Sequence, residues 1–229
     1  MRQILRPLLV LCASLLAPAG FAQVVHARLE YPGKVNPPLP PAVVWLKALE
    51  PVDPPAALAH KTYTLLQKNR SFTPHLLVVP VGSQVQFPNQ DPFYHNVFSL
   101  FDGKRFDLGL YEAGSTKAVT FSREGVSYIF CNIHPEMSAV VVALSTPFFA
   151  TTDRDGAADL HDVPPGDYDL HVWVEGLPQA ALDRLTRRVH LTAGQTDLGA
   201  VRIPVMPAQA ERHLNKFGQP YDREAKPPY

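Results

Sequence analysis

The chain has 229 residues, and its formal net charge is zero at pH 7 with 18% charged residues. This balance argues against a nucleic acid or an anionic membrane as partner, and no basic cluster is longer than Arg187–Arg188. The length allows one or two domains, and twenty-four prolines, about twice the usual share of about 5%, indicate many short strands joined by rigid turns.

The first 22 residues have the three parts of a secretory signal peptide. Arg2 and Arg6 supply a positive region, residues 8–16 an apolar stretch, and residues 18–22 a small-residue exit that predicts cleavage after Ala22. The apolar stretch is shorter than the roughly 20 residues that a membrane span needs. We therefore expect a periplasmic or secreted protein with no membrane span in its mature form.

Short strands are predicted along most of the remaining chain. Residues 24–30 and 42–49 form two strand-like segments separated by a connection rich in proline and glycine. Eight short segments with turn signals between them follow from residue 62 to residue 145, and many alternate apolar with polar residues. This pattern predicts an antiparallel β-sandwich or barrel.

The pattern after residue 146 is different but still typical of β-structure. A hairpin is expected to turn at Asp155–Gly156, residues 167–174 alternate, and residues 177–186 hold the one candidate helical turn. The Asp-Arg-Asp-Gly sequence that ends at Gly156 lacks the later carboxylates of a calcium loop, so we interpret it as a turn. Residues 205–229 form a polar, charged tail.

The most informative stretch places Cys131, His134 and Met137 at three-residue intervals in a loop between two predicted strands. With one more imidazole, these soft ligands make the His₂Cys set with a weak axial Met that suits a blue-copper site. His95 is the candidate for that imidazole, with His75 as its stand-in. Once Cys12 leaves with the signal peptide, Cys131 has no partner for an internal disulfide.

Other interpretations of this stretch remain open. Cys131 is compatible with a buried core cysteine, a zinc ligand, or a nucleophile with His134 as its base. A thioether ligand argues against zinc, and no orienting acid or oxyanion donor is evident for an enzyme. The remaining histidines are isolated in sequence, and we interpret them as surface or strand residues.

The His-Asn-Val sequence at residues 95–97, followed by Cys-x-x-His-x-x-Met, resembles the cupredoxins. The short loop with a proline after its histidine is most similar to amicyanin. The resemblance covers residues 62–146 and implies a cupredoxin Greek-key β-sandwich with one type 1 copper site. The ligands that it implies are His95, Cys131, His134 and Met137.

The same resemblance implies roles for residues around the ligands. Asn96 would tie the two ligand-bearing loops together, and Pro135 would limit the freedom of the backbone there. In cupredoxins the ring edge of the ligand that corresponds to His134 is exposed in an apolar patch where redox partners dock. Phe93 and Tyr94 would build that patch here. Glu136 adds a charge beside it, so the identity of the partner does not carry over.

Residues 148–204 resemble carboxypeptidase-regulatory-like, or transthyretin-like (prealbumin-like), β-sandwich modules. The resemblance lies in the Thr-Thr-Asp-Arg-Asp-Gly turn at residues 151–156 and in the Val-Pro-Pro-Gly turn that follows. Such modules begin with strands that are missing after residue 146 but present at residues 24–50. We therefore predict that the cupredoxin unit is inserted into a second domain made of residues 24–50 and 148–204. The alternative is that residues 24–50 add strands to the cupredoxin sandwich.

The leading hypothesis is a periplasmic carrier of single electrons that cycles between Cu(II) and Cu(I) and is not an enzyme. The combination of modules resembles methylamine-utilisation or plastocyanin-like secreted proteins, which gives weak guidance to the substrate. The alternatives are a copper storage or delivery protein and a structural β-sandwich protein of the cell envelope.

Overall fold

A computed structural model describes residues 22–33, 39–51, 61–100, 103–205 and 214–221. Apart from Ala22, the predicted signal peptide lies outside these residues, as does most of the predicted tail. Strands joined by turns and loops make up the described residues. The one helix among them, α1 (Gln179–Asp183), is short and lies inside the expected helical region. The predicted all-β fold class is therefore confirmed. Among the described residues, no helix is long and apolar enough to cross a membrane.

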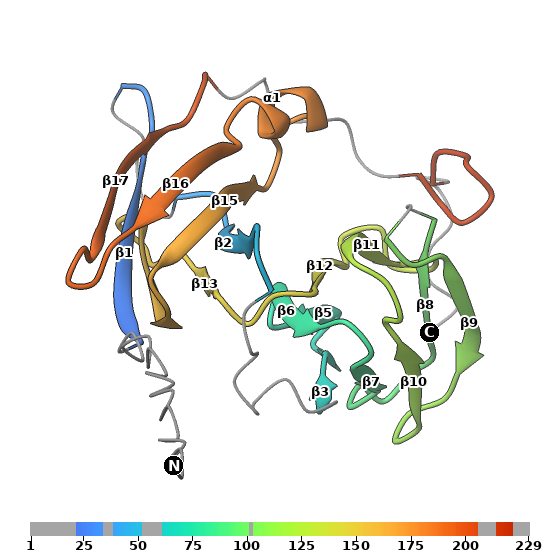
Figure 1. Cartoon of the computed structure of the whole chain (residues 1–229). Coiled ribbons are helices and arrows are strands. Elements are labelled where there is room, and N and C mark those ends of the chain that lie inside the picture. The colour runs from blue at the N-terminus through green and yellow to red at the C-terminus, as the bar shows by residue number, and fades with distance from the viewer. Residues whose placement is uncertain (1–21, 34–38, 52–60, 101–102, 206–213, 222–229) are drawn as a thin grey trace, which may run out of the picture.

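Residues 61–100 and 103–144 form a β-sandwich, here called the first sandwich, on the right of Figure 1. Its larger sheet has the order β6-β12-β11-β8-β9 and its smaller sheet the order β10-β7-β3. Both sheets contribute side chains to one core, which includes Phe87 from the smaller sheet and Ile129 from the larger. The strands are β3 (Thr62–Thr64), β6 (Leu76–Pro80), β7 (Gln84–Pro88), β8 (His95–Ser99), β9 (Phe106–Tyr111), β10 (Thr116–Thr120), β11 (Gly125–Cys131) and β12 (Ser138–Leu144).

A small hairpin, β4 (Leu66–Lys68) and β5 (Ser71–Thr73), completes this part of the chain. Its two turn residues, Asn69 and Arg70, have positive φ angles of 56° and 53°. Consecutive positive φ angles are those of the type I′ turn that suits two-residue hairpins, although asparagine or glycine usually occupies them. The sequence analysis did not predict β5.

The other strands form a second sandwich. One sheet has the order β14-β1-β17 and the other the order β13-β2-β15-β16. The strands before residue 50, β1 and β2, therefore pair only with strands after residue 148 among the described residues. The strands are β1 (Gln23–Glu30), β2 (Ala42–Ala48), β13 (Phe149–Thr151), β14 (Ala157–Val163), β15 (Gly166–Val174), β16 (Arg187–Leu191) and β17 (Asp197–Arg202).

Strand β12 is buried on both faces, because it lies between the cores of the two sandwiches. Ala139 and Val141 pack in the first core, whereas Val140 and Val142 pack in the second. Side chains of a strand alternate between its faces, so a strand between two cores needs apolar residues at every position. This explains why residues 139–144 are continuously apolar.

A polar contact also joins the two sandwiches. His75, just before β6, bonds through Nε2 to the carboxylate of Glu175 at 2.8 Å and through Nδ1 to the carbonyl of Ser138 at 3.1 Å. The hydrogen bond to Glu175 raises the pKa of His75 above its ordinary value, although burial opposes this effect. Protonated His75 therefore stabilises the folded protein.

We expect His75→Gln to destabilise the protein more at pH 5.5 than at pH 8.5. A raised pKa in the folded state adds stability below the unfolded pKa of about 6.5, and this stability is lost as the pH rises through the folded pKa. The pair is partly exposed, so the difference should be about 0.5–1 kcal/mol. Denaturant unfolding at the two pH values measures it, with His190→Gln, in the more exposed pair with Asp167, as control. Equal effects at both pH values would contradict the prediction.

Candidate metal centre

The loop between β11 and β12 is a closed turn that brings its three candidate ligands together. The backbone N–H of Met137 donates to the carbonyl of His134 at 3.0 Å, with Pro135 and Glu136 between them. Proline suits the position after the first residue of such a turn, because its φ is already fixed. The N–H of Cys131 donates to the carbonyl of Met137 at 3.2 Å, which closes the loop at its base.

Three donor atoms converge in the space between this loop and the start of β8. His95 Nδ1 lies 3.7 Å from Cys131 Sγ, His134 Nδ1 lies 3.6 Å from the same sulfur, and the two ring nitrogens are 3.1 Å apart. These three residues form the one group of His, Cys, Asp or Glu side chains in the described residues that could hold a metal ion. All three are buried.

The spacing fits a single metal ion. Bonds of about 2.0–2.1 Å to nitrogen and about 2.3 Å to sulfur, at angles near 100–120°, place the donor atoms about 3.1–3.8 Å apart. Two unprotonated ring nitrogens as close as those of His95 and His134 repel each other unless a proton or a cation lies between them. The three side chains are therefore spaced as the ligands of one cation would be, and they could hold a metal ion.

Met137 lies in the same core as Cys131, and its side chain is fully buried. Met137 ends the turn that begins at His134, and β12 starts at the next residue. His75, the alternative to His95, is not part of the cluster and contacts Glu175 and Ser138 instead.

Burial sets the protonation of the cluster. It lowers the pKa of both His95 and His134, and in His134 the neighbouring His95 lowers it further. Burial also raises the pKa of the Cys131 thiol, an effect that hydrogen bonds from the backbone N–H groups of Asn96, Ile133 and His134 partly offset. The imidazoles are thus neutral and available as ligands near pH 7, and the sulfur is surrounded by donors that favour a thiolate.

A residue that the sequence analysis missed, Asp91, holds the ring of His95. The carboxylate of Asp91 is 5% exposed, and its Oδ2 lies 2.8 Å from His95 Nε2. Burial works to raise the pKa of Asp91, but hydrogen bonds from Arg70, His95 and Asn69 lower it overall. An ionised carboxylate only accepts, so Nε2 carries the proton and Nδ1 directs its lone pair into the cluster.

The same carboxylate organises the hairpin turn beside the site. Its two oxygens accept the backbone N–H groups of Asn69 at 2.6 Å and Arg70 at 2.9 Å. These are the two turn residues with positive φ. Asp91 therefore joins the β4–β5 turn to the ligand on β8.

Asn96, which was predicted to tie the two ligand-bearing loops together, contacts the ligand loop through its backbone, and its side chain bonds elsewhere. Its Nδ2 donates to Asp107 Oδ1 on β9 at 2.6 Å. The contacts to the ligand loop come from its backbone: its N–H faces the Cys131 sulfur, and its carbonyl accepts the N–H of Asn132 at 3.4 Å. The reason is the alternation along β8, which directs the Asn96 side chain to the face opposite the cluster.

The surroundings of His134 bear on the predicted partner patch of Phe93 and Tyr94. The side chain of His134 is only 2% exposed, and its Nε2 is buried and has no hydrogen-bond partner among the described residues. The ring of Phe93 packs against both imidazoles, with centroid distances of 5.3 Å to His95 and 5.4 Å to His134, and the guanidinium of Arg70 lies over the same ring, 5.2 Å from its centroid. Tyr94 is exposed. Phe93 thus covers the ligands rather than flanking an exposed ring edge.

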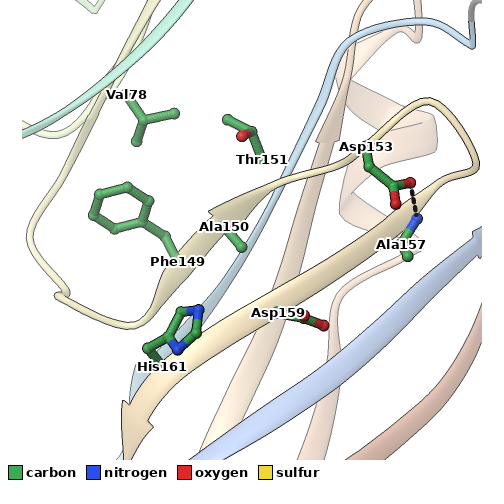
Figure 2. Close-up of a pocket in the computed structure, with 8 residues that line it drawn as sticks. All are labelled: Val78, Phe149, Ala150, Thr151, Asp153, Ala157, Asp159 and His161. Atoms are coloured by element: carbon green, nitrogen blue, oxygen red, sulfur yellow. Dashed lines mark hydrogen bonds between the residues drawn. The ribbon is translucent and has the colours of Figure 1, made fainter.

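A surface pocket lies apart from this cluster, beside β13 and β14 (Figure 2). Its acidic groups already have partners: Asp153 accepts the N–H of Ala157 at 2.8 Å, and Asp159 contacts His26 at 2.7 Å. The turn role predicted for the Asp153 segment is consistent with the first of these bonds. The lining residues are Val78, Phe149, Ala150, Thr151, Asp153, Ala157, Asp159 and His161.

Comparisons with a family model and with solved structures each match part of the chain. A family model described as polysaccharide lyase family 4, domain II, matches residues 137–198. This is not the carboxypeptidase-regulatory-like family that the motif after residue 150 indicated, and the match begins within the ligand loop. No curated protein sequence matches the chain.

Several solved structures are similar to part of the chain. They include a purple cupredoxin from Nitrosopumilus maritimus, with 24% identity over 36% of this chain and 99% of that chain at a TM-score of 0.33. A copper-containing nitrite reductase (NirK) from Thermus scotoductus SA-01 has 28% identity over 43% of this chain and 24% of that chain, at 0.35. A reduced amicyanin variant has 22% identity over 36% of this chain and 82% of that chain, at 0.34. At these TM-scores the alignments do not define the fold.

Proposed function

We propose that the protein is a copper-binding carrier of single electrons. The observation that carries this proposal is the buried triangle of one sulfur and two imidazole nitrogens, 3.1–3.7 Å apart, with a buried methionine three residues beyond. This is the donor set of a His₂Cys site with an axial thioether, in which His95, Cys131, His134 and Met137 would hold the metal. Copper would supply the one-electron Cu(II)/Cu(I) couple.

The protein's own part is to keep the ligands in place. The turn from His134 to Met137 and the base of the loop are fixed by backbone hydrogen bonds. Asp91 fixes the ring of His95, and Phe93 packs on both imidazoles. Ligands held in this way move little when the charge of the metal changes, which favours rapid electron transfer.

Burial of the site favours a carrier over a storage or delivery protein. Delivery needs a metal that leaves quickly, whereas the donor atoms here are enclosed and Cys131 is fully buried. The donor set also favours copper over zinc, because zinc sites in proteins use Cys, His and carboxylate ligands rather than thioether. We do not propose an enzyme, because Cys131 is fully buried and its sulfur offers a substrate no access.

The domain organisation, the location and the partner of the protein are also proposals. We propose a cupredoxin domain at residues 62–146, inserted into a second β-sandwich domain made of residues 24–50 and 148–204. The strand pairing of β1 and β2 and the two separate cores support this division. We also propose export through the N-terminal signal, a periplasmic or secreted location, and a redox protein as partner.

Addition of Cu(II) to the mature protein tests the function. We expect an intense visible absorption from thiolate-to-copper charge transfer, at one copper per chain, and a reversible one-electron wave in voltammetry. Copper exchange with a chelator should be slow. Rapid exchange with no reversible wave would favour delivery, and absence of the visible band would refute the proposal. Titration with Zn(II) in competition shows which metal the site prefers.

Met137→Gln should keep the visible band but shift it and lower the reduction potential. The amide oxygen replaces a soft axial sulfur with a harder donor, which stabilises Cu(II) relative to Cu(I). Absorption spectra and voltammetry of the copper-loaded variant measure both effects. Met206, which follows the described strands, offers a matched control as Met206→Gln, for which we expect no change. An unchanged spectrum in Met137→Gln would show that its thioether is not a ligand.

A further inference from the structure

Residues 214–221, here called the strap, bond to the last residue of β11 and to the residue after it. The hydroxyl of Tyr221 donates to the backbone carbonyl of Cys131 at 2.8 Å. The backbone N–H of Lys216 donates to Asn132 Oδ1 at 3.0 Å. In Figure 1 the red segment lies beside the ends of β8, β9 and β11. The strap thus contacts a candidate ligand directly and also the residue after it.

A second connection runs from the strap to the other ligand-bearing strand. Lys216 Nζ lies 2.8 Å from Asp107 Oδ2 on β9. The other oxygen of Asp107 accepts Asn96 Nδ2 at 2.6 Å, next to His95. The backbone N–H of Asn96 faces the Cys131 sulfur. Lys216 therefore acts on both strands that carry candidate ligands, through Asp107 and Asn96 on one side and Asn132 on the other.

The strap is itself a folded turn. Asn215 Oδ1 accepts the N–H groups of Phe217 at 2.9 Å and Gln219 at 3.0 Å, and the backbone N–H of Asn215 donates to the carbonyl of Gln219 at 2.8 Å. Burial raises the pKa of Tyr221, and the nearby Cys131 raises it further. A turn closed by its own side chain presents Lys216 and Tyr221 in fixed positions.

We propose that Lys216 and Tyr221 are positioning residues of the metal centre and that the strap is a structural component of this centre. This inference rests on the proposed copper site. The hydrogen bonds of the strap hold the peptide group after Cys131 and the carboxylate of Asp107, which in turn bonds to Asn96. They therefore limit the opening of the ligand loop. Entry to Cys131 and loss of the metal both require that opening.

Thiol labelling of the metal-free, full-length mature protein tests this proposal without any metal. We expect Tyr221→Phe and Lys216→Met each to speed the reaction of Cys131 with a disulfide reagent about 3–10-fold, as the loss of one hydrogen bond of about 1 kcal/mol predicts. The double variant should be faster than either single variant. Lys216→Arg, which keeps the ion pair with Asp107, should react at nearly the wild-type rate.

The copper-loaded proteins provide the second readout. Both variants should release copper to a chelator faster by a similar factor and should shift the visible band. Tyr168→Phe is the matched control, because the Tyr168 hydroxyl donates to the carbonyl of Pro164 at 2.7 Å in the second sandwich. We expect it to lower stability without changing either rate.

The proposal is overturned if the double variant is labelled at the wild-type rate, or if Tyr168→Phe speeds labelling as much as Tyr221→Phe does. Failure of the copper assignment is a separate result. Absence of the visible band in the wild-type protein would refute copper, whereas the labelling rate of the metal-free protein decides by itself whether the strap restrains Cys131.

Discussion

Cys131→Ser is expected to abolish the visible absorption of the copper-loaded protein. The band arises from charge transfer between thiolate sulfur and copper, and a serine hydroxyl is a hard donor that stays protonated near pH 7. Copper affinity should fall by more than the 10–100-fold typical for loss of an outer-shell partner, because one of the proposed ligands itself is removed. Absorption spectroscopy and competition with a chelator measure the two effects.

The protein should remain folded after this substitution. Cys131 is fully buried, but backbone N–H groups of Asn96, Ile133 and His134 already face its sulfur and can bond the serine oxygen. We expect a loss of about 1–2 kcal/mol in the free energy of unfolding of the metal-free protein. A visible band that persists in the folded Cys131→Ser protein would show that sulfur is not a ligand, and the copper proposal would then fail.

Much of the fold could be predicted because its strands show period-two alternation and are bounded by proline and glycine. The continuous apolar run at residues 139–144 indicated burial but not the reason, since only the structure shows a second core against its outer face. Strand β5 was missed because its three residues, Ser71–Thr73, alternate too briefly to stand out. Its turn also lacks glycine, and the positive φ angles of Asn69 and Arg70 depend on Asp91 from a distant part of the chain.

The candidate site, too, could be predicted only in part from the sequence. The spacing of Cys131, His134 and Met137 identified the loop, and His95 was chosen because it begins a strand with His-Asn-Val; the structure brings His95, Cys131 and His134 together. One sequence feature pointed to the role of Asp91: it is an acidic residue four positions before His95. However, the Asp-Pro sequence is equally typical of a turn, and sequence does not show which side chain reaches a ring. The direction of the Asn96 side chain and the contacts of the strap depend on packing that local patterns do not encode.

Asp91→Asn is expected to weaken copper binding about 10–100-fold, the range for partners that orient a histidine ligand. Asn has one acceptor oxygen, whereas the carboxylate accepts three hydrogen bonds from His95, Asn69 and Arg70. Its amide N–H₂ group, placed at His95 Nε2, would favour a proton on Nδ1, the atom that faces the cluster. The ring would then have to change its tautomer before it could bind a metal. Competition with a chelator measures the affinity, and voltammetry shows whether the reduction potential changes.

The same variant should also destabilise the metal-free protein by about 1.5–3 kcal/mol, since it removes buried hydrogen bonds to a charged group. Asp159→Asn is its matched control, because Asp159 also pairs with an imidazole, that of His26 at 2.7 Å, but both side chains are more than half exposed. We expect that control to change stability very little and copper affinity not at all. If Asp91→Asn lowers stability but leaves copper affinity and potential unchanged, Asp91 supports only the β4–β5 turn. A loss in the free energy of copper binding that exceeds the loss in the free energy of unfolding would instead show that Asp91 orients the ring of His95.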